Sequence, residues 1–369
     1  MRIAVFYDLP AGGASRTMEE VLKILNRHHE IIIFQDPKVF SWTKNNRFLR
    51  DFESIHFQSF KQRRLAKKID NQKFDICFVS HDRHSQAPWI LRFLKTPSVF
   101  LCQEPTRAYF EEFLHIDPKL PLLNKIYESI NRKIRKQIEI SNARFAERVV
   151  VNSRYSVESI FRAFGVNATP IHLGIDPKEY FPENISKKNQ VVIVGNNEPQ
   201  KDLPLAVDSV SIIDKKNRPT LVIASPRNSD MRDIVKQAKR KNVKLELLIG
   251  LDQSKLRKIY NQSKLTLALA HLEPFGLSVV ESLACGTPVI AVNEGGFKET
   301  VIDKKTGILV ERDPQIIADA ISLVLIDKKI LSQMGEMGKK DALLRFTWDN
   351  TVSKLEKEFY EAKNIRHHS

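Results

Sequence analysis

The residues best suited to chemistry in this chain are two glutamates in its second half, Glu273 and Glu281, which flank the segment 274–280. The segment predicts a turn followed by a helix that begins near Gly276, where the missing side chain lets a ligand approach the backbone. The first N–H groups of a helix are unpaired and attract anions such as phosphate. Glu281 lies about one helical turn further on, and helical side chains tilt back toward the N-terminus, so we expect both carboxylates at one helix mouth.

Carboxylates that flank a phosphate site can accept hydrogen bonds from sugar and ribose hydroxyls. The spacing therefore predicts a site for a nucleotide sugar. The alternative interpretation is that Glu273 only neutralises the start of the helix while Glu281 lies on a solvated face.

The elements that must position these residues alternate between apolar runs of strand length and amphipathic segments. This alternation indicates an α/β fold with parallel sheets. The predicted strands cover residues 3–7, 30–35, 75–80, 97–102, 147–152 and 170–173, then 190–195, 220–224, 244–249, 264–270, 288–292 and 307–310. They form two Rossmann-like halves, and Pro, Asn and Lys residues at 177–189 interrupt the pattern between them.

The string from Glu273 to Ala291 and the segment 295–301 (Gly-Gly-Phe-Lys-Glu-Thr-Val) resemble the family 4 retaining glycosyltransferases. The resemblance covers nearly the whole chain and implies the GT-B fold, in which two Rossmann-like domains face a cleft. It implies an N-terminal acceptor-binding domain at 1–180 and a nucleotide-sugar-binding domain at 181–345. The segment 346–369 would be a C-terminal helix that crosses back to the first domain.

The resemblance also implies roles for individual residues. Glu273 would contact the donor sugar and Glu281 the ribose, while Lys201 would pair with the diphosphate as the main catalytic cation. The donor-binding residues implied or expected are Gly12, Gly13, Gly195, Asn196, Lys201, Glu273, Phe275, Gly276, Leu277 and Glu281.

Asn196 is a departure, because the family carries an arginine at this position and an amide is a weaker, uncharged donor. Arg16 and Arg227 are candidate substitutes, although either is more simply interpreted as a surface arginine.

Two strand ends in the first half carry further polar side chains. The family often has a histidine that reaches the donor sugar near the end of strand 75–80, which makes His81 a catalytic candidate and His84 a sugar contact. After strand 97–102, the segment from Cys102 to Phe110 resembles one in a mannosyltransferase-like subset. It makes Gln103, Glu104 and Arg107 candidate acceptor or sugar contacts. The alternative for each histidine is a structural role, and no metal-ligand spacing accompanies them.

Composition and charge restrict the class of protein. The 369 residues suffice for two domains. We expect a cytoplasmic protein, because no apolar run spans a bilayer and the first strand begins too early to leave room for a signal peptide. The three cysteines each lie in or beside an apolar run, so we expect buried thiols without a disulfide or a metal.

The net charge of +15 is concentrated in two places. Residues 119–148 predict a basic amphipathic helix, and a second cluster lies at residues 61–73. The basic residues of the helix are Lys119, Lys125, Arg132, Lys133, Arg135, Lys136, Arg144 and Arg148. Such a face favours docking on an anionic membrane surface. The alternative is that its apolar stripe packs on the core. No nucleic-acid module accompanies the charge, so we expect no nucleic-acid partner.

The resemblance therefore predicts a hexosyltransferase with retained anomeric configuration, no required metal and no cofactor beyond the nucleotide-sugar donor. A glycan or lipid-linked hydroxyl would be the acceptor, as in cell-surface polysaccharide synthesis. Three alternatives remain open on the same fold: a nucleotide-sugar-binding protein with little turnover, an epimerase, and a phosphorylase. A phosphorylase would need a lysine that binds pyridoxal phosphate, and the sequence contains no matching motif.

Overall fold

The computed structural model describes residues 1–9, 12–35, 47–111, 114, 116–225 and 228–365. It divides into two compact units: unit 1 comprises Met1–Ile171 and Val352–Ser369, and unit 2 comprises His172–Thr351. The sequence placed the boundary after residue 180. The segment that follows Ile171 packs on unit 2, because the N–H of Ile175 donates to the carbonyl oxygen of Phe346 at 2.9 Å.

Unit 1 is built on a six-stranded parallel sheet in the order β2-β1-β3-β4-β5-β6. Its strands are β1 (Arg2–Phe6), β2 (Glu30–Phe34), β3 (Ile76–Val79), β4 (Ser98–Leu101), β5 (Arg148–Val151) and β6 (Thr169–Pro170). The central strands β3 and β4 are buried at every position. This burial explains why they are continuous apolar runs rather than alternating patterns.

Helices cover both faces of this sheet. They are α1 (Gly13–Leu25), α2 (Arg47–Phe52), the π-helix η2 (Glu53–Phe57), α3 (Gln58–Asn71), α4 (Ile90–Phe93), α5 (Arg107–Phe110), α6 (Leu122–Ala143), α7 (Arg154–Phe164) and α15 (Trp348–Ile365). One core cluster joins residues of α3, α4 and α7, such as Ile69, Ile90 and Phe164, to strand residues such as Val79 and Phe100. Ser153 caps the start of α7 with a hydrogen bond from the N–H of Ser156.

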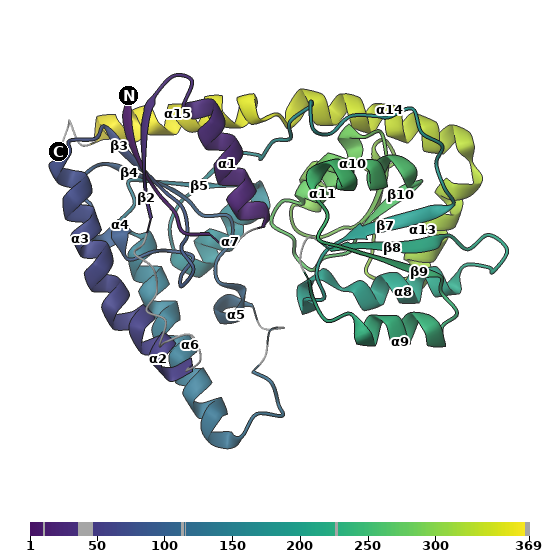
Figure 1. Ribbon diagram of the computed structural model, residues 1–369, viewed down its shortest axis with the longest axis horizontal. Coiled ribbons are helices and arrows are strands. Elements are labelled where there is room, and N and C mark those ends of the chain that lie inside the picture. Colours follow the sequence, from purple (N-terminus) through teal and green to yellow (C-terminus); the bar gives the residue numbers. More distant parts are fainter. Residues whose placement is uncertain (10–11, 36–46, 112–113, 115, 226–227, 366–369) are drawn as a thin grey trace. The chain divides into compact units, whose positions relative to one another are not determined.

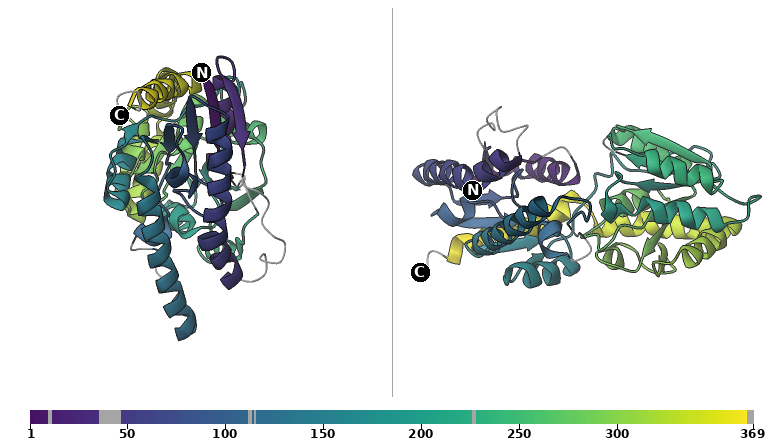
Figure 2. Two further views of the ribbon diagram at one scale, coloured as in Figure 1. Left: turned by 90° about the vertical axis from the view of Figure 1, so that its left-hand side faces the viewer. Right: turned by 90° about the horizontal axis from the view of Figure 1, so that it is seen from below.

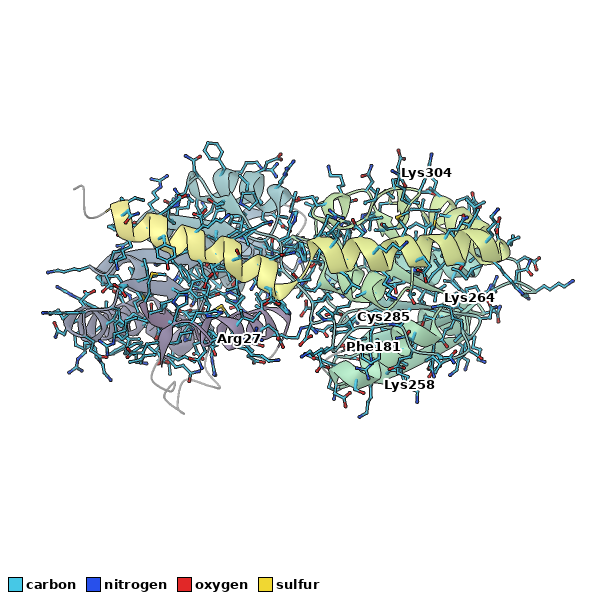
Figure 3. All side chains as sticks on the ribbon, turned by 90° about the horizontal axis from the view of Figure 1, so that it is seen from above. Arg27, Phe181, Lys258, Lys264, Cys285 and Lys304 are labelled. Carbon is cyan, nitrogen blue, oxygen red and sulfur yellow. The ribbon has the colours of Figure 1, made fainter. Side chains whose placement is uncertain are left out.

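The C-terminal helix α15 packs on unit 1 from Val352 onward. Figure 3 shows it as the yellow helix that lies along this unit. The ring of Phe359 meets that of Phe78 in β3 edge to face at 5.3 Å. Arg148 donates to Glu358 and Lys363 donates to Asp75, both at 2.7 Å. A helix at the end of the chain therefore completes the core of the first unit.

Helices α2, α3 and α6 extend together away from the sheet (Figures 1 and 2). Asp51 joins α2 to α6, because it accepts hydrogen bonds from three residues of α6: Tyr127 at 2.8 Å, Asn131 at 3.1 Å and Arg135 at 2.7 Å. The predicted basic helix of residues 119–148 is therefore present as the 22-residue helix α6.

Unit 2 has a second six-stranded parallel sheet in the order β12-β11-β10-β7-β8-β9. Its strands are β7 (Gln190–Val194), β8 (Thr220–Ser225), β9 (Leu245–Ile249), β10 (Leu265–Ala268), β11 (Val289–Val292) and β12 (Gly307–Val310). Its helices are η3 (Pro199–Lys201), α8 (Leu203–Ile212), α9 (Arg232–Arg240), α10 (Gln253–Gln262), α11 (Leu277–Ala284), α12 (Phe297–Thr300), α13 (Pro314–Ile326) and α14 (Lys328–Arg345). Helices α8 and α9 lie on one side of the sheet, and α10 and α11 lie on the other (Figure 1). Each predicted strand is present within a few residues of its expected bounds.

The three cysteines, Cys77, Cys102 and Cys285, are free thiols and are buried. Cys285, labelled in Figure 3, directly follows α11. Burial raises the pKa of each thiol above its ordinary value. All three are therefore protonated core residues at neutral pH.

The packing of α15 predicts that Phe359→Ala destabilises unit 1 by about 3–5 kcal/mol, because the ring is fully buried against Phe78. Denaturant unfolding measures the loss. The matched control is Tyr360→Ala, since the neighbouring ring is 53% exposed and its removal should change little. Equal effects of the two substitutions would contradict the described packing of α15.

Candidate functional site

The candidate site lies at the carboxyl edge of the sheet in unit 2. Strands β12, β11, β10 and β7 are neighbours and run in parallel, so the loops that follow them meet at this edge. These loops are residues 311–313, 293–296, 269–276 and 195–202. Open α/β sheets bind ligands outside the carboxyl ends of their strands.

Lys201 and Glu273 form an ion pair at this edge, with 2.7 Å between Nζ and Oε2. The lysine side chain is 30% exposed and the glutamate side chain 20%, so the pair is accessible from solvent. Gly195 provides the space for the lysine stem, because a Cβ at this position would lie 3.2 Å from Cγ of Lys201. The two residues that the sequence singled out are therefore brought into direct contact from loops 72 positions apart.

The turn after Glu273 is packed tightly against the loop that follows β11. Gly295 has a φ of +54°, and a Cβ there would lie 2.5 Å from the carbonyl oxygen of Glu273. The N–H of Gly296 donates to the same oxygen at 2.7 Å. Only glycine fits position 295 without moving Glu273. The glycine pair therefore fixes the backbone that carries the carboxylate.

Helix α11 begins one residue later than Gly276, which is its N-cap, so Leu277 is its first residue. Phe275 is buried and its ring lies 5.7 Å from that of Phe346. Its side chain is thus part of the core, and only the backbone near Phe275, Gly276 and Leu277 remains as a candidate anion contact.

Glu281 lies inside unit 2 and is only 2% exposed. Its carboxylate accepts a hydrogen bond of 2.9 Å from the hydroxyl of Tyr260 in α10. Burial and the neighbouring carboxylate raise the pKa of Tyr260 well above its ordinary value, so the phenol remains a donor. The interpretation of Glu281 as a solvated surface residue is wrong. Its contact with a ribose stays a prediction.

Asn196 stands where the resemblance expects an arginine, and its side chain is held in place by a neighbour. Its Oδ1 accepts a hydrogen bond of 3.1 Å from the hydroxyl of Ser225. The proposed substitute Arg227 lies outside the described residues. Arg16 is in α1 of unit 1, where its N–H donates to the carbonyl oxygen of Gly12 at 3.1 Å.

Arg312 links all four loops of this edge, and the sequence analysis missed it. From the loop after β12, it donates to both carboxylate oxygens of Glu294 at 2.8–2.9 Å. It also donates to Asp202 and to the carbonyl oxygen of Leu269, both at 2.8 Å. Arg312 therefore connects the loops that follow β11, β7 and β10, and indirectly holds Lys201 beside Glu273.

Other contacts reinforce this connection. The N–H of His271 donates to the carbonyl oxygen of Gln200 at 2.8 Å, and its ring lies 3.3 Å from Asp202. Glu294 is partly buried, which would raise its pKa, but its hydrogen bonds and the charge of Arg312 outweigh this and lower it. In the sequence, Arg312 and its partner Glu294 lie among polar and charged residues directly after predicted strands. This pattern is common on solvated surfaces and did not single them out.

A groove of about 790 Å³ lies beside the edge strand β9, lined by residues 228–232 and by Val235, Lys236, Leu247 and Ile249. The loop of Asn197 borders it, because the Asn197 amide donates to the carbonyl oxygen of Asp230 at 2.6 Å. No pattern in the sequence predicts this groove.

In unit 1, His81 and Gln103 lie two positions after the ends of β3 and β4, which are adjacent strands. Burial lowers the pKa of His81 to about 4, so the ring is neutral at pH 7. Within the described part of the chain, Nδ1 of His81 and Nε2 of Gln103 are buried and have no hydrogen-bond partner. Polar atoms of this kind are rare inside proteins and are consistent with a ligand contact.

His84, Glu104 and Arg107 are engaged with other protein groups. The backbone N–H of His84 donates to Asp82 at 2.7 Å. Arg107 donates to Glu111 at 2.8 Å, and its Nε lies 4.0 Å from the carboxylate of Glu104. His84 also lines a cavity of about 10 Å³ near Asp82 and Glu139. This cavity holds at most a water molecule and is too small for a sugar.

Gly12 and Gly13 form the start of α1. The N–H of Gly12 donates to the hydroxyl of Ser15 at 3.0 Å, and the carbonyl oxygen of Gly13 accepts from Thr17 at 2.9 Å. Their contact with a donor stays a prediction. Among the residues that the structure describes, no group of three or more His, Cys, Asp or Glu side chains is placed to hold a metal ion.

Two family models match the chain. The model described as Glycosyltransferase Family 4 matches residues 11–179, and the model described as Glycosyl transferases group 1 matches residues 176–341. Together they cover residues 11–341, which are most of both units, and they meet at residues 176–179.

Individual proteins show the same similarity. An uncharacterized glycosyltransferase of Methanocaldococcus jannaschii is 24% identical over 285 residues, which cover 71% of this chain and 70% of that protein. The structure of a sucrose-phosphate synthase from Thermosynechococcus elongatus matches with a TM-score of 0.77 at 17% identity over all of both chains. The Anabaena protein HepE in complex with UDP-glucose matches with a TM-score of 0.73 at 15% identity, over 98% of this chain and 100% of that one.

The network around Arg312 predicts that Arg312→Met lowers the free energy of unfolding by about 3 kcal/mol at pH 7, because Glu294 and Asp202 lose their shared partner. The pKa of Glu294 is lowered in the folded protein, so its pairing stabilises the fold above about pH 4.3 and is lost as the pH falls through the folded pKa. The difference between the variant and the wild type should therefore shrink between pH 7 and pH 3 in denaturant unfolding.

The matched control is Arg232→Met. Arg232 also forms an ion pair, with Asp230, but its side chain is 83% exposed, and we expect no measurable change. A loss for Arg312→Met that is the same at both pH values would contradict the role of its charge.

Proposed function

The chain belongs to the family 4 glycosyltransferases of the GT-B fold, and on this basis we propose that it transfers a hexose from a nucleoside-diphosphate sugar to a hydroxyl acceptor. The observation that carries the proposal is the ion pair of Lys201 with Glu273 at the carboxyl edge of unit 2. A cation and a carboxylate held side by side suit a ligand that combines a diphosphate with sugar hydroxyls.

In this proposal Lys201 and the backbone N–H groups at the start of α11 stabilise the negative charge that develops on the departing diphosphate. Glu273 orients the donor sugar by accepting hydrogen bonds from its hydroxyls. It also holds the ammonium of Lys201 in position before the donor binds. Glu281 contributes through the ribose, from a position fixed by Tyr260.

The reaction retains the anomeric configuration and needs no metal and no cofactor besides the donor. The resemblance of residues 273–291 to the retaining family supports these features. His81, which is neutral at pH 7, contacts the donor sugar, and Gln103 with Glu104 and Arg107 contacts the sugar or the acceptor. A neutral imidazole at this position can accept or donate a hydrogen bond without adding charge.

The acceptor is a glycan or a lipid-linked hydroxyl used in cell-surface polysaccharide synthesis. The enzyme acts in the cytoplasm, bound peripherally to the inner face of the membrane through the basic residues of 119–148. No helix within the described residues is long and apolar enough to cross a bilayer.

A second candidate is a nucleotide-sugar-binding protein with little turnover, favoured by Asn196 and Gln103 in place of charged or titratable residues. Donor binding by calorimetry, followed by transfer assays over an acceptor panel, separates the two functions. An epimerase on the same fold would convert the free donor without any acceptor, which nuclear magnetic resonance of the donor alone detects.

Lys201→Ala and Glu273→Gln should each lower kcat/KM at least tenfold, or about 1.4 kcal/mol of transition-state stabilisation. The matched control is Lys255→Ala, which removes an exposed lysine of α10 from its ion pair with the N-cap residue Asp252 and should leave kcat/KM unchanged. Wild-type kinetics in both site variants would reject the assignment of the ion pair.

The correct donor at 100 times its Kd should stabilise the protein by about 2.7 kcal/mol. A thermal-shift screen of GDP-, UDP- and ADP-sugars identifies it, and the shift should disappear in Lys201→Ala but not in Lys255→Ala. A shift of equal size in the two variants would place the donor elsewhere.

A further inference from the structure

Unit 1 exposes a set of large apolar side chains on the helices that extend from its sheet. They are Phe52 in α2, Phe60 in α3, and Leu123, Ile126, Ile130 and Ile134 in α6, here called the tip face. Leu123 is 79% exposed and Phe60 is 58% exposed, and the other four are also exposed. Single exposed apolar residues are common, but a set of six on α6 and on the continuous α2–α3 segment beside it indicates an interaction surface.

The tip-face residues of the α2–α3 segment and those of α6 lie on the same side of this pair of helical segments. Helix α3 continues from α2 through η2 and leads into β3, and α6 leads into β5 of the same parallel sheet, so the helices run in the same direction. They meet where Asp51 contacts Asn131. Successive helical residues are rotated by about 100° in one sense, so Phe52, one position after Asp51, and Ile130, one position before Asn131, turn to the same side.

The opposite side of the pair faces the core through polar side chains. Gln62 in α3 donates to Asp82 at 2.6 Å and accepts from the N–H of Ile90 at 2.7 Å. Glu139 in α6 accepts from Thr106 at 2.6 Å and from the N–H of Gln86 at 2.9 Å. The alternative in which the apolar stripe of residues 119–148 packs on the core is therefore wrong, because most of the stripe is exposed and these polar residues face the core.

The helices of the tip face also carry exposed positive charge. Exposed basic residues of the same helices include Arg64, Lys67 and Lys133. The guanidinium of Arg64 lies 5.4 Å from the ring centroid of Phe60, so charge and apolar surface are directly adjacent. Large apolar side chains surrounded by lysine and arginine are the chemistry that binds an anionic lipid interface.

We propose that the tip face inserts into the headgroup region of an anionic lipid bilayer, with Phe52 and Phe60 contributing as much as the stripe of α6. The inference deepens the peripheral association proposed above by naming its side chains, and it does not depend on the transfer reaction. A second copy of the chain fits less well, because pairing two tip faces would bring two clusters of positive charge together.

The test measures co-sedimentation with vesicles of phosphatidylglycerol and phosphatidylcholine in equal amounts, and with vesicles of phosphatidylcholine alone. The wild type should bind the anionic vesicles and lose most binding at 0.5 M NaCl, because salt screens the basic residues. Phe60→Ser and Leu123→Ser should each weaken binding by about tenfold, and the double variant should weaken it further.

The matched control is Leu344→Ser in α14, which removes an equally exposed leucine, at 77%, outside the tip face. It should bind vesicles as the wild type does. Thermal unfolding checks that each variant is folded, and the donor shift of unit 2 measured on the same samples separates failure of this inference from failure of the proposed function.

Two results would overturn the inference. One is binding to anionic vesicles that Phe60→Ser and Leu123→Ser leave unchanged. The other is a dimer of the wild type in sedimentation velocity that these substitutions dissociate, which would assign the tip face to a second copy of the chain.

Discussion

The guanidinium of Arg312 is the interaction on which the geometry of the candidate site depends. It binds groups in the three neighbouring loops of one sheet edge, Glu294, Leu269 and Asp202, from a fourth loop of its own. Parallel strands deliver loops to one edge but do not fix how those loops meet. A planar group with five donors can satisfy several acceptors at once, which a lysine cannot do. The position of Lys201 beside Glu273 follows from this connection together with the tight packing of Gly295.

Arg312 and Lys201, two cations at the carboxyl edge of the unit 2 sheet, have different roles. Arg312 is occupied by two carboxylates and a carbonyl oxygen, so its role is to position the loops. Lys201 pairs with the carboxylate of Glu273 across an accessible contact, so in the proposed function its ammonium can also bind a diphosphate oxygen. The absence of an arginine at position 196 therefore leaves Lys201 as the main cation of the proposed donor site, and Asn196 contributes only a neutral amide.

Unit 1 shows a different balance of polar and apolar groups. The inner side of α6 is polar and the outer side is apolar, the reverse of an ordinary surface helix. Glu139 is nearly fully buried, and burial raises its pKa, although hydrogen bonds from Thr106 and Gln86 act in the other direction. A buried polar layer of this kind needs its partners in place, which explains why α6 is tied to α2 and to the loops after β3 and β4. The apolar side is left for the membrane contact that we propose.

Much of the fold could be predicted from the sequence because the central strands of both sheets are buried on two faces. Continuous apolar runs such as 76–79 and 289–292 carry that signal locally. The helix at 119–148 was also predictable, but the direction of its stripe was not, since the same periodicity fits a core face and an exposed face. The sequence predicted a boundary after residue 180, whereas the contacts of the irregular segment 172–180, such as those with Phe346 and Trp348, group it with unit 2.

For the site, the sequence by itself determined the residue types and their local setting: a carboxylate before a helix start, a lysine after a strand, and a glycine pair after another. Tertiary structure alone decided which of them meet. Lys201 and Glu273 are brought together across 72 residues, Glu281 is buried and accepts a hydrogen bond from Tyr260, and Arg312 joins loops that no local pattern relates. The physical reason is that side-chain hydrogen bonds and ion pairs between distant loops depend on the order of strands in the sheet, which periodicity does not encode.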